Sequence, residues 1–154
     1  MNAENLKKLV IDIVKRACDL KNTHTSAKDA PVNYAAVFAQ SDGEFEFLQK
    51  TARALGKVIQ KTPTGPLFKI ASLATVAGDL QLLKIRKPDK ARTERGDADF
   101  TVENYSAFKQ TFLPQTGFKL IEREEFEMIE LSDSNYNVIA YFSHPPLDEQ
   151  LGIK

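Results

Sequence analysis

Apolar residues recur at steps of three and four through residues 4–20, which predicts an amphipathic helix. Charged residues of both signs occupy the opposite side. The stripe is expected to dock on the rest of the domain. The alternative is a helix that binds a partner, because the mixed polar face disfavours a membrane surface. Residues 21–31 are predicted to form a loop with His24 exposed to solvent. The stripe comprises Leu6, Leu9, Val10, Ile13, Val14, Ala17 and Leu20.

The pattern changes after residue 31 to short runs with strand propensity that surround one helix. Residues 32–39 form the first predicted strand. Ser41 and Glu44 then match a capping box, in which the serine begins a helix and the glutamate lies three residues on. Gly56 is a plausible end for that helix. Three further strands are predicted at 57–61, 67–76 and 79–86.

The second half of the chain repeats this order of elements. A strand at 97–102 is followed by a helix that opens at Glu103 and ends before Pro114. Strands are then predicted from Gly117, at 126–131 and at 138–142. We therefore predict one α+β domain over 1–154, built from two consecutive βαβββ modules that form curved mixed sheets. Its parts are an N-terminal helix and loop (1–31), the modules (32–87 and 97–144), a linker (88–96) and a tail (145–154).

Composition narrows the class of protein. Lys and Arg number 21, as do Asp and Glu, so the formal net charge is zero. This balance disfavours electrostatic capture of nucleic acid. Cys18 is the single cysteine, which excludes an intramolecular disulfide. No apolar run is long enough to span a membrane, and residues 1–20 lack the apolar core of a signal peptide. We expect a cytoplasmic protein without a membrane or nucleic-acid partner.

The order of elements resembles the vicinal oxygen chelate superfamily, which includes glyoxalase I, extradiol dioxygenases and bleomycin-resistance proteins. The likeness covers about residues 32–144 and is clearest in the strand and helix at 99–108 followed by Gly117 and Phe118. It implies two curved four-stranded sheets, each enclosing a concave site.

Metal-using members of that superfamily supply His, Gln or Glu from the first and last strands of each module. The first strand here has no such residue, and the strand at 79–86 offers Gln81. Asp97 and Asp99 alternate onto one face of a strand, and His144 lies just past the end of the last strand. We therefore expect no catalytic metal and no other cofactor.

The linker between the modules is the densest polar stretch. It is either a solvated connection or an anion site, because guanidinium groups bind carboxylate and phosphate with two hydrogen bonds. We expect a small anionic or aromatic-polar ligand in a concave, metal-free site. Arg86 is the favoured ligand-binding residue because it ends a strand. The full set of candidate ligand-binding residues is Arg86, Arg92, Arg95, Asp99 and Tyr141.

Two further residues are candidates for acid–base chemistry of the lyase or isomerase type. Glu127 shares one face of its strand with Ile129 and Leu131, and a glutamate in an apolar site can act as an acid or base. His144 is the second candidate. The rival function is a non-enzymatic interaction module that acts through its first helix, on a partner or on a second copy as a homodimer.

Overall fold

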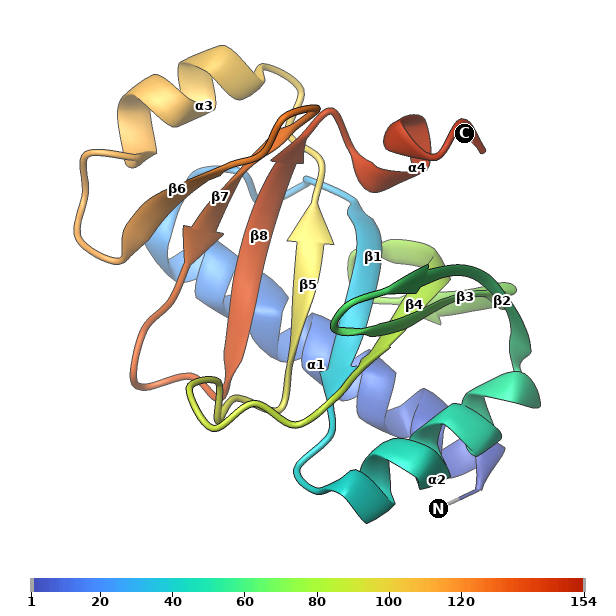
Figure 1. Cartoon of the computed structure of the whole chain (residues 1–154). Coiled ribbons are helices and arrows are strands. Elements are labelled where there is room, and N and C mark those ends of the chain that lie inside the picture. The colour runs from blue at the N-terminus through green and yellow to red at the C-terminus, as the bar shows by residue number, and fades with distance from the viewer. Residues whose placement is uncertain (1, 154) are drawn as a thin grey trace.

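The computed structural model describes residues 2–153 and contains the two predicted modules behind an N-terminal helix (Figure 1). Each module runs strand, helix and three strands, so the predicted order is confirmed. The elements are α1 (Ala3–His24), β1 (Val32–Phe38), α2 (Asp42–Arg53), β2 (Gly56–Thr62), β3 (Gly65–Thr75), β4 (Gly78–Arg86), β5 (Gly96–Phe100), α3 (Tyr105–Phe112), β6 (Phe118–Glu122), β7 (Glu127–Leu131), β8 (Val138–His144) and α4 (Leu147–Gln150).

The strands form one eight-stranded sheet in the order β2-β3-β4-β1-β5-β8-β7-β6. Within each module the first and last strands are parallel neighbours, β1 with β4 and β5 with β8. The modules meet where β1 pairs antiparallel with β5, for example at Ala35 and Ala98. The two four-stranded sheets that the resemblance implied are thus joined into a continuous one.

Helix α1 crosses the back of the sheet and contacts strands of both modules (Figure 1). The side chain of Asn2 caps its first turn by accepting a hydrogen bond from the Asn5 amide. Of the predicted stripe, six residues are buried and Leu9 is half-buried. Gly96 on β5 allows α1 to approach the sheet closely, because a Cβ atom at this position would lie only 2.8 Å from Cδ1 of Ile13. The apolar stripe is therefore covered by the sheet of the same chain.

The predicted loop over 21–31 begins too early. The helix continues to His24, whose Nε2 lies 2.9 Å from Oδ2 of Asp133 on the loop between β7 and β8. Lys21 lies in the last turn of the helix, and its buried ammonium donates to the carbonyl oxygens of Ala27 and Lys28. A lysine in an amphipathic helix is ordinarily exposed, so the sequence did not signal this contact.

Burial along α1 predicts a difference between two substitutions. Ile13 is 1% exposed, so Ile13→Ala is expected to lower the free energy of unfolding by roughly 2–5 kcal/mol. Leu9 packs only partly against the core, and Leu9→Ala is expected to cost clearly less. Urea unfolding of both variants at one pH measures the difference. Equal losses would contradict the position of α1.

Helix α2 begins as its capping box predicts. The Ser41 hydroxyl accepts a hydrogen bond from the Glu44 amide at 3.1 Å, and Glu44 accepts one from the Gln40 amide at 2.9 Å. Glu44 also binds Arg95 through both carboxylate oxygens, at 2.6 and 3.2 Å. This bidentate pair fixes the end of the linker to the start of α2.

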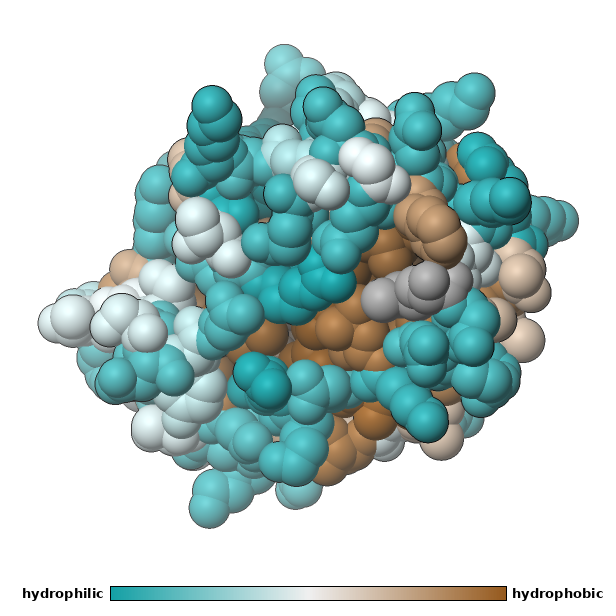
Figure 2. Space-filling model, turned by 90° about the horizontal axis from the view of Figure 1, so that it is seen from below, coloured by the Kyte–Doolittle hydropathy of each residue, from teal (hydrophilic) through white to brown (hydrophobic). Residues whose placement is uncertain are grey.

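The two faces of the sheet differ. Buried residues of α1, α2 and α3 pack on one face, while the other is concave and overlaid at one end by α4 (Figure 1). Seen from the end that carries α2, the surface is mostly hydrophilic around one apolar hollow (Figure 2). Within residues 2–153, no helix combines the length and the apolar character that crossing a membrane needs.

Candidate functional site

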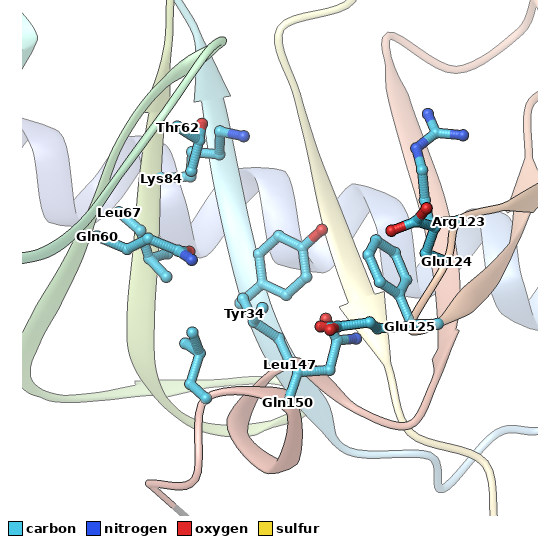
Figure 3. Close-up of a pocket in the computed structure, with 12 residues that line it drawn as sticks. Tyr34, Gln60, Thr62, Leu67, Lys84, Arg123, Glu124, Glu125, Leu147 and Gln150 are labelled. Carbon is cyan, nitrogen blue, oxygen red and sulfur yellow. The ribbon is translucent and has the colours of Figure 1, made fainter.

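A cavity of about 590 Å³ lies on the concave face, and we call it the trough. Both modules and α4 contribute to it, so it crosses the seam between β1 and β5 (Figure 3). Its size suits a small organic molecule. The residues that line it are Tyr34, Gln60, Thr62, Leu67, Lys84, Arg123, Glu124, Glu125, Phe126, Leu147, Gln150 and Leu151.

Tyr34 and Lys84 are the polar groups on the floor of the trough. Tyr34 is on β1 and Lys84 on β4, and the β1–β4 register sets Lys84 beside Ala36, which shares a face with Tyr34. The Tyr34 ring points into the middle of the trough (Figure 3). Neither the Lys84 ammonium nor the Tyr34 hydroxyl has a hydrogen-bond or ion-pair partner among residues 2–153. Both groups are free to meet a ligand.

The environment shifts the pKa of both groups. Burial lowers the pKa of Lys84, and the negative charge of Asp97 only partly offsets this effect. The pKa of Tyr34 is held well above its ordinary value by burial and by the charges of Asp99 and Asp97. The phenol therefore keeps its proton at neutral pH and can donate a hydrogen bond.

The walls of the trough are mostly apolar, with Gln60, Thr62 and Gln150 as polar neighbours, and its rim is charged. Leu67 lies beside Lys84 in the β3–β4 register, and Phe126, Leu147 and Leu151 line other parts of the cavity. Arg123, Glu124 and Glu125 stand at the rim and are exposed. The trough thus combines a cationic and phenolic floor with hydrophobic walls.

A pair of buried acids lies on the same face of the sheet, on β5. Asp97 and Asp99 are 5% and 0% exposed, and their pairing with Ala36 and Tyr34 puts them on the concave face. Asp99 accepts hydrogen bonds from the Ser143 amide and hydroxyl. Oδ1 of Asp97 is buried without a hydrogen-bond partner among residues 2–153. Burial raises the pKa of each acid to about 7.

Two of the three candidate arginines belong to this charged region. Arg92 donates to Glu130 at 2.5 Å, and Glu130 also accepts from the Tyr141 hydroxyl at 2.9 Å. Arg86 lies 4.8 Å from the centre of the Phe38 ring and pairs with Asp89 at 3.3 Å. Its side chain is 20% exposed, so it does not point into bulk solvent.

The structure brings Arg86, Arg92, Asp99 and Tyr141 to the concave face, but none of them lines the trough. Arg95 is separate from them, because Glu44 and the Phe38 carbonyl oxygen take up its guanidinium. We therefore assign Arg95 a structural contact between the linker and α2.

Glu127 and His144 lie on the opposite, helix-covered face. Glu127 accepts hydrogen bonds from the Tyr105 hydroxyl and the Lys109 ammonium, both at 2.8 Å. The His144 ring stacks on Tyr105 at 4.6 Å. Alternation explains the placement, because Ile129, two residues after Glu127, belongs to the core beneath the helices. Neither residue lines the trough, and an acid–base role for either of them stays a prediction.

A metal of the kind that the vicinal oxygen chelate resemblance implies does not fit the residues present. Tyr34, Lys84, Asp99 and Tyr141 face the concave side from the four central strands. One is a cation, and burial raises the pKa of both tyrosines so that they remain protonated. In the part of the chain that the structure describes, no three His, Cys, Asp or Glu side chains gather closely enough to hold an ion.

Comparison with known proteins gives a likeness of fold. No family model and no curated protein matches the chain. A solved structure described as "Structural Genomics, Protein EC4020" superposes with a TM-score of 0.74 and 9% identity, over 97% of this chain and 91% of that chain. At this identity the match concerns the fold alone.

Two further structures give lower scores. A glyoxalase/bleomycin resistance protein/dioxygenase superfamily member from Vibrio splendidus 12B01 matches with a TM-score of 0.47 and 7% identity, over 74% of this chain and 97% of that chain. A mutant of 4-hydroxymandelate synthase from Streptomyces coelicolor has a TM-score of 0.38 and 12% identity, over 79% and 50%. The paired βαβββ topology is the one that the vicinal oxygen chelate resemblance predicted. The chain has this paired topology, as its own element and strand order shows.

The sequence pattern did not predict Tyr34, Lys84 and Asp97 as a group. Tyrosine and lysine are not the ligands that metal-using members of the superfamily supply, so these two residues did not stand out on their strands. A signal was present, because Lys84 is two residues before Arg86 and must share its face on a strand.

Proposed function

We propose that the protein binds a small aromatic carboxylate or a similar anionic, aromatic-polar molecule in the trough without a metal. The observation that carries the proposal is a pair of polar groups, Lys84 and Tyr34, at the floor of a mostly apolar cavity and without partners among residues 2–153. The ammonium would pair with the anionic group, and the phenol would donate a hydrogen bond to one of its oxygens. The ring of the ligand would pack against Leu67 and Phe126.

Buried charged groups lie on the same face of the sheet as the trough and contribute to the electrostatic field inside it. The positive charges of Lys84, Arg86 and Arg92 all favour the ionised form of Asp97, so the cations and acids of this region stabilise one another. In the proposal, Arg86, Arg92, Asp99 and Tyr141 set the field in which the ligand binds and do not touch it. A ligand anion next to Lys84 would replace part of the solvation that the ammonium loses on burial.

Calorimetry with phenylacetate and its uncharged analogue phenylacetamide tests the proposal. We expect phenylacetate to bind more tightly, because only its carboxylate gains the charge-assisted hydrogen bond. Lys84→Met is expected to weaken phenylacetate binding by roughly tenfold to a hundredfold, since such a bond contributes about 1.5–3 kcal/mol. Binding of phenylacetamide should change little.

Lys69→Met is the matched control. Lys69 is an exposed lysine on the adjacent strand β3, outside the trough, so its loss should leave the affinity for phenylacetate unchanged. Equal binding of phenylacetate by the parent and Lys84→Met proteins, with the fold of both verified by circular dichroism, would contradict the proposal.

A further inference from the structure

Lys84 differs from the other lysines that are buried or half-buried in the partners of its amine. Lys21 is fully buried, but its ammonium donates to Asn22 and to two backbone carbonyl oxygens. Lys109 is held by Glu127 at 2.8 Å. Lys84 is half-buried, borders a cavity and has no such partner within residues 2–153. Its amine is therefore both accessible to a small molecule and unoccupied.

We propose that Lys84 is a nucleophilic amine that condenses with the carbonyl carbon of an aldehyde or a 2-oxo acid bound in the trough. The inference rests on the proposed function, because the carbonyl compound must first occupy the same cavity. It adds a covalent step and restricts the ligand class to molecules with a reactive carbonyl group.

The surroundings of Lys84 favour this chemistry. A lysine attacks a carbonyl group only as the neutral amine, and a poorly solvated position keeps more of it in that form. Leu67 lies beside Lys84 across β3 and β4, and Ala36 lies beside it on β1. This apolar setting lowers the pKa of Lys84 through loss of solvation. Each unit of lowering raises the neutral fraction about tenfold at a pH below the pKa.

The step balances without an oxidant or a metal. The ammonium gives a proton to water in the cavity, and the nitrogen lone pair forms a bond to the carbonyl carbon. The π electron pair moves to the oxygen, which takes up a proton, and the adduct nitrogen gives up its second proton. After a second protonation the oxygen leaves as water while the nitrogen lone pair forms the C=N bond. The sum is an ammonium and a carbonyl compound giving a protonated imine and one water.

Tyr34 is suited to orient the carbonyl group during the attack. Its hydroxyl lines the trough and has no partner in the described chain, and its raised pKa keeps the proton in place. A hydrogen bond from this phenol to the carbonyl oxygen would draw electrons away from the carbon that Lys84 attacks.

Reductive trapping tests the proposal. The full chain is incubated at pH 7 with phenylpyruvate and cyanoborohydride, which reduces an imine to a stable secondary amine, and the modified lysine is identified by peptide mass mapping. We expect one modification per chain, on Lys84, at least about tenfold faster than on Lys69. Phenyllactate, which has a hydroxyl in place of the carbonyl group, should slow the labelling without being trapped.

Variants separate this inference from the proposed function. Lys84→Arg should abolish the fast labelling, and Lys69→Arg should retain it. Because the site is mapped on the unmodified sequence, the test stands even if Lys84→Arg does not fold. Labelling of Lys84 no faster than of Lys69 would overturn the inference. If phenylpyruvate binds by calorimetry and is not trapped, the covalent step is wrong while the proposed function stands.

Discussion

Raising the pH from about 5 to about 8 is expected to lower the free energy of unfolding, and Asp97→Asn is expected to remove much of this loss. Asp97 and Asp99 lie on one face of β5, both buried, and burial raises the pKa of each to about 7. The charge of Asp99 adds to the shift at Asp97. An unfolded aspartate has a pKa of about 3.9.

The direction follows from proton binding. Between about pH 4 and pH 7 the folded protein holds protons on this pair that the unfolded chain has released, so stability falls as the pH rises. It levels off above the folded-state pKa. The loss is on the order of a few kcal/mol, since one unit of pKa corresponds to about 1.4 kcal/mol. The comparison begins at pH 5 because paired carboxylates make stability rise with pH in the range below. Glu44 is one of them, since Arg95 lowers its pKa.

Urea unfolding at four pH values between 5 and 8.5 measures this slope. Asp97→Asn keeps the size of the side chain and removes the buried charge, so the variant should be the more stable protein at pH 8. Asp79→Asn, at an exposed position on β4, is the control and should keep the parent slope. Stability that rises between pH 5 and 7 would be incompatible with a protonated pair.

Arg92→Met is expected to cost roughly 3 kcal/mol of stability. Glu130 has a side chain that is 7% exposed and is held by Arg92 and Tyr141. Removing the arginine leaves a buried carboxylate with one neutral donor, and breaking a buried pair in this way costs about 3–5 kcal/mol. The low end applies because Arg92 is 26% exposed.

Thermal and urea unfolding of two further variants complete this experiment. Arg16→Met breaks an exposed pair with Asp12 and should cost less than about 1 kcal/mol. The double variant Arg92→Met with Glu130→Met removes both charges, so it should recover part of the loss. A single Arg92→Met variant as stable as Arg16→Met would mean that Glu130 is solvated.

The order of elements could be predicted because local signals mark it. The stripe of α1, the capping box at Ser41 and Glu44 and the break at Pro114 each depend on neighbours within one or two turns. The closure of eight strands into one sheet could not be predicted. It depends on β1 pairing with β5, and no signal among residues that are neighbours in the sequence specifies this pairing.

The candidate site was predicted only in part, and strand alternation explains why. It correctly grouped Glu127 with Ile129 and Leu131, but it cannot say which face of a sheet the helices will cover. Once α1 and α3 cover that face, Glu127 and His144 are removed from the trough. Tyr34 and Lys84 come to the same face through the parallel pairing of β1 and β4, two strands that lie far apart in the sequence.

Helix α1 precedes every strand in the chain, yet it packs against β1, β3, β5 and β8. During synthesis its apolar side therefore emerges long before the surface that will cover it is complete. The first module can pair its own strands early, but the shared core closes only after β8 has left the ribosome. The interval in which part of this stripe is uncovered is thus set by the time needed to translate the segment from α1 to β8. During that interval the nascent protein most depends on protection from aggregation.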